Sequence, residues 1–278
     1  MLFLLGCDII ILFESKNDKI VILPGEITIV KVKERMNKKM RKEKWKNFLQ
    51  KYKHAWVLSY FIIYSIWFIF LEQRTQVEHY PIHMHLDDVI PFCEYFIVPY
   101  LLWFAFIAAT MLYFFFADVE GFYKCCALLF TGMTICLIIY TFFPNEQNLR
   151  PVTFERSNMF IDWVQMIYHG DSSTNVCPSI HVLNSIGAFC AIWESPNLRK
   201  RKWLIASSGL LALSICMSTV FLKQHSMVDV LCGAGLAIAL YALVYRINYP
   251  KLLAGLAELQ NKNSNRIRKN NNKQNEIG

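Results

Sequence analysis

The chain has 278 residues, of which 55% are hydrophobic, 15% are aromatic and only 18% are charged. An average soluble domain is less apolar and more highly charged, so this composition argues against one and indicates a membrane protein. The formal net charge of +8 is unevenly spread, because basic residues gather in the segments that flank the apolar part of the chain.

Residues 1–53 are predicted to be a basic N-terminal segment on the cytoplasmic side, with eleven Lys or Arg residues between Lys31 and Lys53. The first residues, MLFLLGCDIIILF, have no basic stretch before them and no cleavage site after them, so they are a poor signal peptide, and they are too short to cross a bilayer. This favours a native start at Met36 or Met40, which would leave residues 1–35 outside the native protein.

Six apolar runs follow, and a bilayer span takes about 20 such residues. The fourth run is short and contains Asn184 and Ser185, but it lies between two firmer runs. We therefore expect an all-α fold in which residues 54–247 form a six-helix transmembrane bundle. The predicted spans are residues 56–72, 92–116, 125–143, 179–194, 203–222 and 227–246.

The basic flanks predict the topology, because Lys and Arg near span ends favour the cytoplasmic side. Both termini are expected in the cytoplasm of a multi-pass cell-membrane protein, with the loops 73–91, 144–178 and 223–226 outside. Residues 248–278 are expected to be a basic, disordered tail. Nucleic-acid binding would also explain basic tails, but their position beside membrane spans is accounted for by topology and anionic lipids, so we expect no nucleic-acid partner.

The long outer loop, residues 144–178, contains apolar residues at helical spacing from Phe160 to Tyr168. With Ser157 as its N-cap, this pattern predicts a short amphipathic helix at the outer interface. Such a helix could either plug the bundle or gate a substrate.

The stretch STVFLKQHSMVDV contains His225 and Asp229, which a helix would place on one face as neighbours. A carboxylate there can orient the imidazole and leave its other nitrogen free as a nucleophile or base. A self-satisfied structural ion pair is the alternative, although ionisable groups inside a membrane are usually functional.

Two further stretches are expected on the same side of the membrane. In CPSIHV, Ser179 and His181 lie at the start of the fourth span, where free backbone N–H groups favour an anion. In NLRPV, Arg150 offers a planar guanidinium suited to phosphate oxygens. A nucleophile, an acid and cations together suit phosphoryl transfer; hydrolysis by Ser179 as a nucleophile is the competing catalytic interpretation.

These stretches resemble the motifs of the type 2 phosphatidic acid phosphatase superfamily of membrane lipid phosphatases. Pro178 to His181 is similar to its P-S-x-H motif, Ser218 to Asp229 to its S-R-x5-H-x3-D motif, and Arg150-Pro151 to the end of its K-x6-R-P motif. The resemblance covers roughly residues 140–245. It implies a core like that of bacterial acid phosphatases and vanadium haloperoxidases, and an enzyme that needs no metal or other cofactor.

The resemblance also implies roles for individual residues. His225 would be the nucleophile that becomes phosphohistidine, Asp229 its orienting partner, and His181 the acid that protonates the leaving alcohol. Arg150 and Ser179 would bind the phosphate. The substrate would be a lipid phosphate that enters sideways from the outer leaflet, with its head group near His225.

Two positions depart from the motifs, because Phe143 replaces the Lys and Thr219 the Arg. Lys223 is expected to supply one of the missing charges as a further phosphate ligand. The alternatives to a phosphatase are a head-group phosphotransferase like inositol phosphorylceramide synthase, a catalytically inactive scaffold or transporter, and a haem-binding bundle with His181 and His225 as axial ligands.

Weaker patterns have simpler explanations. The segment His79 to Asp88 contains histidines that could bind zinc, but Asp87 and Asp88 are better explained as caps of a helix that begins near Ile90. The GAGLAI segment at Gly233 lies inside a span, which favours close helix packing over dinucleotide binding. His169 and Asp171 either line the entrance to the site or face solvent.

Overall fold

The structure of the protein is a computed structural model that describes residues 11–15, 18–22, 27–74 and 76–247. The chain forms two compact units, residues 1–56 and 57–278. In the first unit, β1 (Ile11–Ser15) pairs antiparallel with β2 (Asp18–Ile22), and α1 (Ile27–Lys51) follows. The tail that was expected to be disordered, residues 248–278, lies outside the described residues, as do the first ten residues.

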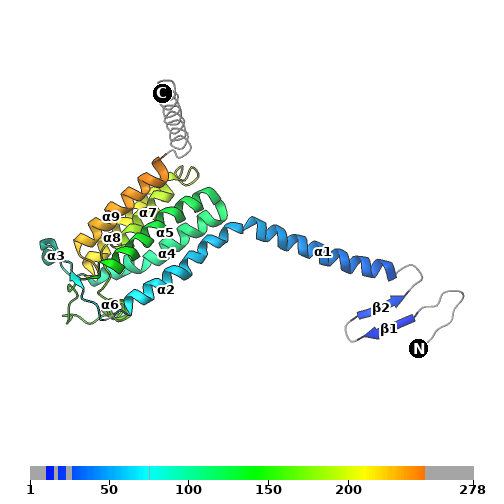
Figure 1. The fold of residues 1–278 in the computed structure, drawn as a ribbon, viewed down its shortest axis with the longest axis horizontal. Coiled ribbons are helices and arrows are strands. Elements are labelled where there is room, and N and C mark those ends of the chain that lie inside the picture. Colours follow the sequence, from blue (N-terminus) through cyan, green and yellow to red (C-terminus); the bar gives the residue numbers. More distant parts are fainter. Residues whose placement is uncertain (1–10, 16–17, 23–26, 75, 248–278) are drawn as a thin grey trace, which may run out of the picture. The chain divides into compact units, whose positions relative to one another are not determined.

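The second unit is a bundle of helices that run side by side (Figure 1). Each of its main helices is rich in apolar residues. Their side chains pack between the helices or lie on the outer surface, where a membrane would contact them. These helices are α2 (Tyr60–Glu72), α4 (Ile97–Ala117), α5 (Val119–Phe142), α7 (Ile180–Glu194), α8 (Lys202–Phe221) and α9 (Met227–Tyr241). A 3₁₀ segment, η1 (Lys53–Ser59), precedes α2, and a π-helical segment, η3 (Ala242–Arg246), follows α9.

Small elements gather at one end of the bundle, where α7 and α9 begin. They are β3 (Tyr80–Pro81), α3 (His85–Val89), η2 (Glu94–Phe96), β4 (Asn145–Glu146) and α6 (Met159–Gly170). β3 pairs parallel with β4, with Tyr80 opposite Asn145, so two loops far apart in sequence are joined there. We call this the histidine end, because His181 and His225 lie at it.

Five helical stretches of the described residues are long and apolar enough to cross a membrane, the pattern of a multi-pass membrane protein. The expected sixth span, α7, is apolar but has only 15 residues. At 1.5 Å per residue it extends about 22 Å, less than the roughly 30 Å of a hydrocarbon core. The structure therefore does not confirm a count of six spans, although α7 packs among the longer helices.

The core of the bundle is centred on α5 and α7, with buried side chains added by α4, α8 and α9. Leu128, Leu129 and Leu183 are all at most 1% exposed. Gly187 allows the closest approach, because a Cβ atom there would lie 2.5 Å from Leu128 Cδ2. By contrast, Ile62, Ile63 and other side chains of α2 are exposed, as expected of a surface that faces lipid.

The amphipathic helix predicted in the long loop is α6, but its N-cap is Asn158 and not Ser157. The Asn158 side chain accepts a hydrogen bond from Ile161 N at 3.0 Å. Asn158 Nδ2 also donates to Glu94 Oε1, and Arg156 pairs with the same carboxylate. The loop is thereby tied to η2 at the start of α4.

Candidate active site

His225 and Asp229 form the buried pair that their spacing predicts. His225 Nδ1 lies 3.2 Å from Asp229 Oδ2, and Asp229 is completely buried. The same carboxylate oxygen accepts a hydrogen bond from Ser226 N at 2.9 Å. Asp229 is therefore held in place by the first turn of α9, and because Nδ1 of His225 faces it, Nε2 is the ring nitrogen left for chemistry.

The turn before α9 is shaped by backbone hydrogen bonds to one carbonyl. Gln224 N and His225 N both donate to Thr219 O, at 2.9 and 3.0 Å. Lys223 adopts a left-handed conformation with φ of 52°, which reverses the chain between the two helices. This turn presents His225 to the interior of the histidine end.

Lys223 does not lie where a phosphate ligand was expected. Its Nζ atom donates to Asp87 O and Ile90 O, both at 2.6 Å, in the loop between α2 and α4. Burial lowers the pKa of Lys223, and the nearby carboxylates of Asp87 and Asp88 oppose that shift. In this structure the ammonium group holds two segments of the chain together and does not reach the histidines.

Asp87 has a different role from the one its position suggested. Instead of capping a helix near Ile90, its carboxylate accepts from Met84 N at 2.8 Å, at the start of α3. It also accepts from Ser226 Oγ at 2.6 Å and from Met227 N at 2.8 Å, at the start of α9. The N-terminus of α9 is thus already occupied by a protein carboxylate.

The N-terminus of α7 is pressed against α9. Ser179 N donates to Asp229 O at 3.1 Å, and the Ser179 side chain caps α7 through a 3.4 Å contact with Val182 N. Gly233 makes this approach possible, since a Cβ atom there would lie 2.6 Å from Ser179 O. Close packing is therefore the role of the GAGLAI segment. It fixes the start of α7 beside the histidine–aspartate pair.

His181, the second residue of α7, faces His225. The two ring centroids are 5.6 Å apart, with an interplanar angle of 61°. The rings of Tyr100 and Trp103 from α4 contact the other sides of His181, at centroid distances of 4.9 and 4.5 Å. Residues 44 positions apart in sequence are thus neighbours, as the predicted topology required.

The segment that leads into α7 is held by buried polar groups. Asn145 Oδ1 accepts from Val176 N and Cys177 N, each at 2.8 Å, and Asn145 Nδ2 donates to Cys177 O at 3.0 Å. Tyr140 at the end of α5 donates to Pro178 O at 2.5 Å. The peptide bond between Cys177 and Pro178 is cis.

A cavity of about 450 Å³ opens beside the two histidines. We call it the histidine cavity. Its walls combine aromatic and aliphatic side chains from α2, α4, α5, α6 and α7 with polar side chains that include Asp171 and Gln224. Burial raises the pKa of Asp171, and its electrostatic interactions with Arg150 and His225 oppose that shift. His169 and Asp171 were expected either to line the entrance to the site or to face solvent. Asp171 lines the cavity, whereas His169 is exposed.

Arg150 lies behind this wall, with its guanidinium bonded to protein. Nη1 donates to Asp171 O at 2.8 Å and to Tyr168 O at 3.2 Å, and Nη2 donates to Ser172 O at 2.8 Å and to Gln224 Oε1 at 2.5 Å. Its Cζ atom also lies 4.7 Å from the centroid of the Tyr168 ring. Arg150 therefore holds the loop after α6 against the turn that carries His225.

Gln224 is a site residue that the sequence reasoning missed. Its Oε1 atom accepts from Arg150, but its buried Nε2 has no hydrogen-bond partner among the described residues. An unsatisfied donor in a cavity wall is available to an anion. The signal that could have revealed it was its position next to His225.

The two departures from the motifs also have structural explanations. Phe143 stacks on Tyr80 at a centroid distance of 4.7 Å, beside the β3–β4 pair. Thr219 is completely buried, and its hydroxyl donates to Cys216 O at 2.8 Å within α8. Neither side chain lines the histidine cavity.

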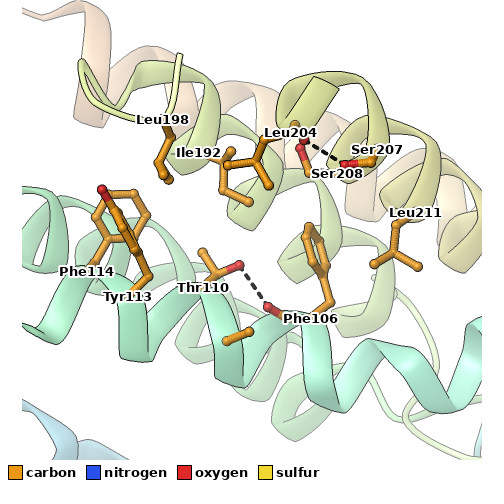
Figure 2. Close-up of a pocket in the computed structure, with 11 residues that line it drawn as sticks. Phe106, Thr110, Tyr113, Phe114, Ile192, Leu198, Leu204, Ser207, Ser208 and Leu211 are labelled. Carbon is orange, nitrogen blue, oxygen red and sulfur yellow. Dashed lines mark hydrogen bonds between the residues drawn. The ribbon is translucent and has the colours of Figure 1, made fainter. Parts of the chain in front are cut away.

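A second cavity, of about 310 Å³, lies at the opposite end of the bundle (Figure 2). It is formed by the C-terminal parts of α4 and α7 and the N-terminal half of α8. Thr110 and Ser208 are its buried polar residues, and each donates to a carbonyl of its own helix. No titratable pair like that of His225 and Asp229 lines this cavity.

The histidines of the loop between α2 and α4 lie apart from the site. His83 Nε2 pairs with Asp88 Oδ1 at 2.8 Å, and both side chains are exposed. In the part of the chain that the structure describes, no group of three or more His, Cys, Asp or Glu side chains is placed to hold a metal ion.

One of three comparisons with known proteins gave a match. Searches of curated proteins and of solved structures gave no match. Residues 123–252 match the family model described as the PAP2 superfamily, a range that includes Arg150, His181, His225 and Asp229. This match is consistent with a member of the type 2 phosphatidic acid phosphatase superfamily, the family that the motifs resemble.

Proposed function

We propose that the protein is an integral membrane lipid phosphate phosphatase that hydrolyses a phosphomonoester or pyrophosphate lipid at the extracytoplasmic face. Members of the PAP2 superfamily are generally phosphatases or phosphotransferases. The observation that carries the proposal is the meeting of His181 with the His225–Asp229 pair at one cavity. That arrangement supplies a nucleophile, its orienting group and a second proton carrier.

In the first step, Nε2 of His225 attacks the phosphorus atom of the substrate. The N–P bond forms as the bond from phosphorus to the lipid alkoxide oxygen breaks, and protonated His181 gives its proton to that oxygen. Asp229 holds the imidazole through Nδ1 and stabilises the positive charge that the ring acquires. The products of this step are a phosphohistidine and the lipid alcohol from a phosphomonoester, or the lipid monophosphate from a pyrophosphate lipid.

In the second step, a water molecule attacks the phosphorus atom of the phosphohistidine. His181, now neutral, takes a proton from that water as the new P–O bond forms and the N–P bond breaks. Inorganic phosphate leaves, and His225 and His181 return to their starting protonation states. The same two histidines therefore serve both halves of the reaction.

The phosphate oxygens need donors and positive charge. The first turn of α7 offers backbone N–H groups, with the Ser179 cap at its start, whereas the first turn of α9 is occupied by Asp87. Gln224 Nε2 is a donor in the wall without a partner in the described part of the chain, and Arg150 supplies positive charge directly behind it. We assign Lys223 to the support of the turn, because its ammonium group is bonded to two carbonyls.

The test is phosphate release in detergent with EDTA present, from a panel of lipid phosphates, by wild type and His225→Ala. We expect release by wild type alone, with a loss of at least about 10⁴-fold in His225→Ala, since removing a nucleophile abolishes the covalent route. Thr110→Val, which alters only the cavity in Figure 2, is the matched control and should retain activity.

A lipid phosphate with a radiolabelled phosphate group tests for the covalent intermediate directly. Acid-labile, alkali-stable label on wild type but not on His225→Ala would report the phosphohistidine. Label without phosphate release would identify a phosphotransferase that lacks its acceptor alcohol. Neither label nor release from any lipid would contradict the proposal and favour the non-enzymatic alternatives.

A further inference from the structure

A third cavity, of about 530 Å³, lies between α2, α4 and α5. We call it the apolar groove. It shares Tyr64, Trp103 and Phe104 with the histidine cavity, so the two spaces adjoin. The remaining walls are apolar side chains, with one exception, Asn184 of α7. A space of this size that adjoins a polar site can hold a substantial part of a ligand.

Two polar atoms of this groove lack hydrogen-bond partners among the described residues. They are Trp103 Nε1, a donor, and Asn184 Oδ1, an acceptor, and both are buried. Asn184 as a whole is only 2% exposed. Buried polar groups are nearly always paired, so an unpaired donor and an unpaired acceptor lining the same space indicate a ligand group that completes them.

The cavity at the opposite end of the bundle provides an internal comparison. There, Thr110, Ser207 and Ser208 all bond to carbonyls of their own helices, as Figure 2 shows for the first two. Short hydroxyl side chains can make such bonds. Asn184 Oδ1, by contrast, has no hydrogen-bond partner among the described residues, and Asn184 lines the groove.

The position of Asn184 relates it to the site. It lies three residues after His181, and therefore on the same face of α7 and about 4.5 Å further along the helix axis. Trp103 contacts the His181 ring directly. A lipid whose phosphate lies between the histidines would thus bring to these two residues the atoms that are a few bonds away from its phosphate.

We propose that the apolar groove holds the tail of the lipid phosphate, and that Trp103 and Asn184 select lipids carrying an amide or hydroxyl group close to the phosphate. This inference rests on the proposed function. An amide or hydroxyl group both accepts and donates, so it can bond Trp103 Nε1 and Asn184 Oδ1 together. An ester accepts only, and an isoprenoid chain offers neither, which leaves one or both protein atoms unsatisfied.

The experiment compares three lipid phosphates of matched tail length by native mass spectrometry of the full-length protein in detergent. The probes are an N-acyl amino-alcohol phosphate, a diacylglycerol phosphate and an isoprenyl phosphate. We expect wild type to bind the amide lipid about tenfold or more tightly than the isoprenyl phosphate, the discrimination typical of a buried hydrogen bond. The ratio of the two dissociation constants, isoprenyl phosphate over amide lipid, should fall towards one in Asn184→Leu. In Trp103→Phe this ratio should fall in part.

Two further measurements test whether a change in this ratio comes from misfolding or from a general effect of substitution. Asn184→Leu should melt at the same temperature as wild type or higher, because it removes an unsatisfied buried group. Thr110→Val should keep the wild-type ratio, since it removes a polar atom from the cavity at the opposite end.

The outcomes separate this inference from the proposed function. Equal ratios in wild type and Asn184→Leu would overturn the role of the amide, even if wild type released phosphate. Tight amide-lipid binding that Asn184→Leu weakens would support the inference even if no phosphate were released, a result that would count against the phosphatase alone.

Discussion

The two ends of the bundle are built partly from the same helices, α4, α7 and α8. They differ in whether the polar side chains that line their cavities have hydrogen-bond partners. At the end shown in Figure 2, the hydroxyl groups of Thr110 and Ser208 donate to carbonyls of their own helices and are therefore already paired. At the histidine end, Gln224, Trp103 and Asn184 line cavities and each has a buried atom with no hydrogen-bond partner among the described residues. Leaving such atoms unpaired costs about 1–3 kcal/mol each. This cost is expected where a ligand will complete the hydrogen bonds.

The loops explain much of this difference. At the histidine end, Arg150, Asn145 and Asp87 bond segments from several parts of the sequence. These bonds fix the backbone around His225 and leave other polar atoms directed at the cavity. The segment between α7 and α8 at the opposite end is short and closes with local bonds such as Arg199 N to Ser195 O.

The largest effect expected after loss of the nucleophile is that of His181→Ala. If His181 protonates the leaving oxygen, kcat for a lipid phosphate should fall about 10²–10⁴-fold. With p-nitrophenyl phosphate, whose leaving group needs no proton, the loss should be far smaller. Steady-state kinetics with both substrates provide the check, and an equal loss with both would assign His181 a structural role.

Gln224→Glu tests the unpaired donor. The substitution keeps an oxygen that can accept from Arg150, but it replaces Nε2 with an oxygen that repels phosphate. We expect KM for the lipid phosphate to rise about 10-fold or more, while the variant stays folded. Gln224→Ala, which removes the donor without adding charge, should show a smaller rise. Unchanged KM in both variants would contradict a role in phosphate binding.

Lys223→Met tests whether this cation is structural. It leaves the carbonyl groups of Asp87 and Ile90 without their donor, so the free energy of unfolding should fall by about 1–3 kcal/mol. The activity of the folded fraction should change little. Thermal melting together with kcat/KM measures both quantities. A strong loss of affinity for the lipid phosphate at unchanged stability would restore Lys223 as a phosphate ligand.

Asp171→Asn is expected to have the smallest effect, a change in thermal stability that depends on pH. Burial raises the pKa of Asp171 in the folded protein, so the protonated form favours folding. This contribution is complete below the pKa of an unfolded aspartate and is lost as the pH rises through the raised folded pKa. Asn cannot ionise, so the melting temperature of the variant minus that of wild type should grow from acid to neutral pH. A constant difference would contradict the assignment.

Much of the site was predictable because it depends on local spacing. The four-residue separation of His225 and Asp229 makes them neighbours on any helix, and the structure shows that contact. The apolar runs predicted the helices, and their alternating directions predicted that His181 and His225 meet. The roles assigned to these residues stay proposals, since geometry does not measure a reaction.

Other features could not be predicted from local spacing. A long cationic side chain reaches many partners, so only the folded loops decided that Lys223 bonds to carbonyls 133 and 136 residues away and that Arg150 faces backbone oxygens. Likewise, Asn184 is an ordinary polar residue of a short span in the sequence. It becomes distinctive only because α2, α4 and α5 enclose a groove around it.

The sequence by itself therefore determined the class of protein, the helices and the histidine–aspartate pair, because composition and helical periodicity act over a few residues. The tertiary structure decided which cations are already occupied, which donors stay free and how far the histidine cavity extends. Those properties depend on contacts between segments that are far apart in the chain, and no short-range pattern encodes them.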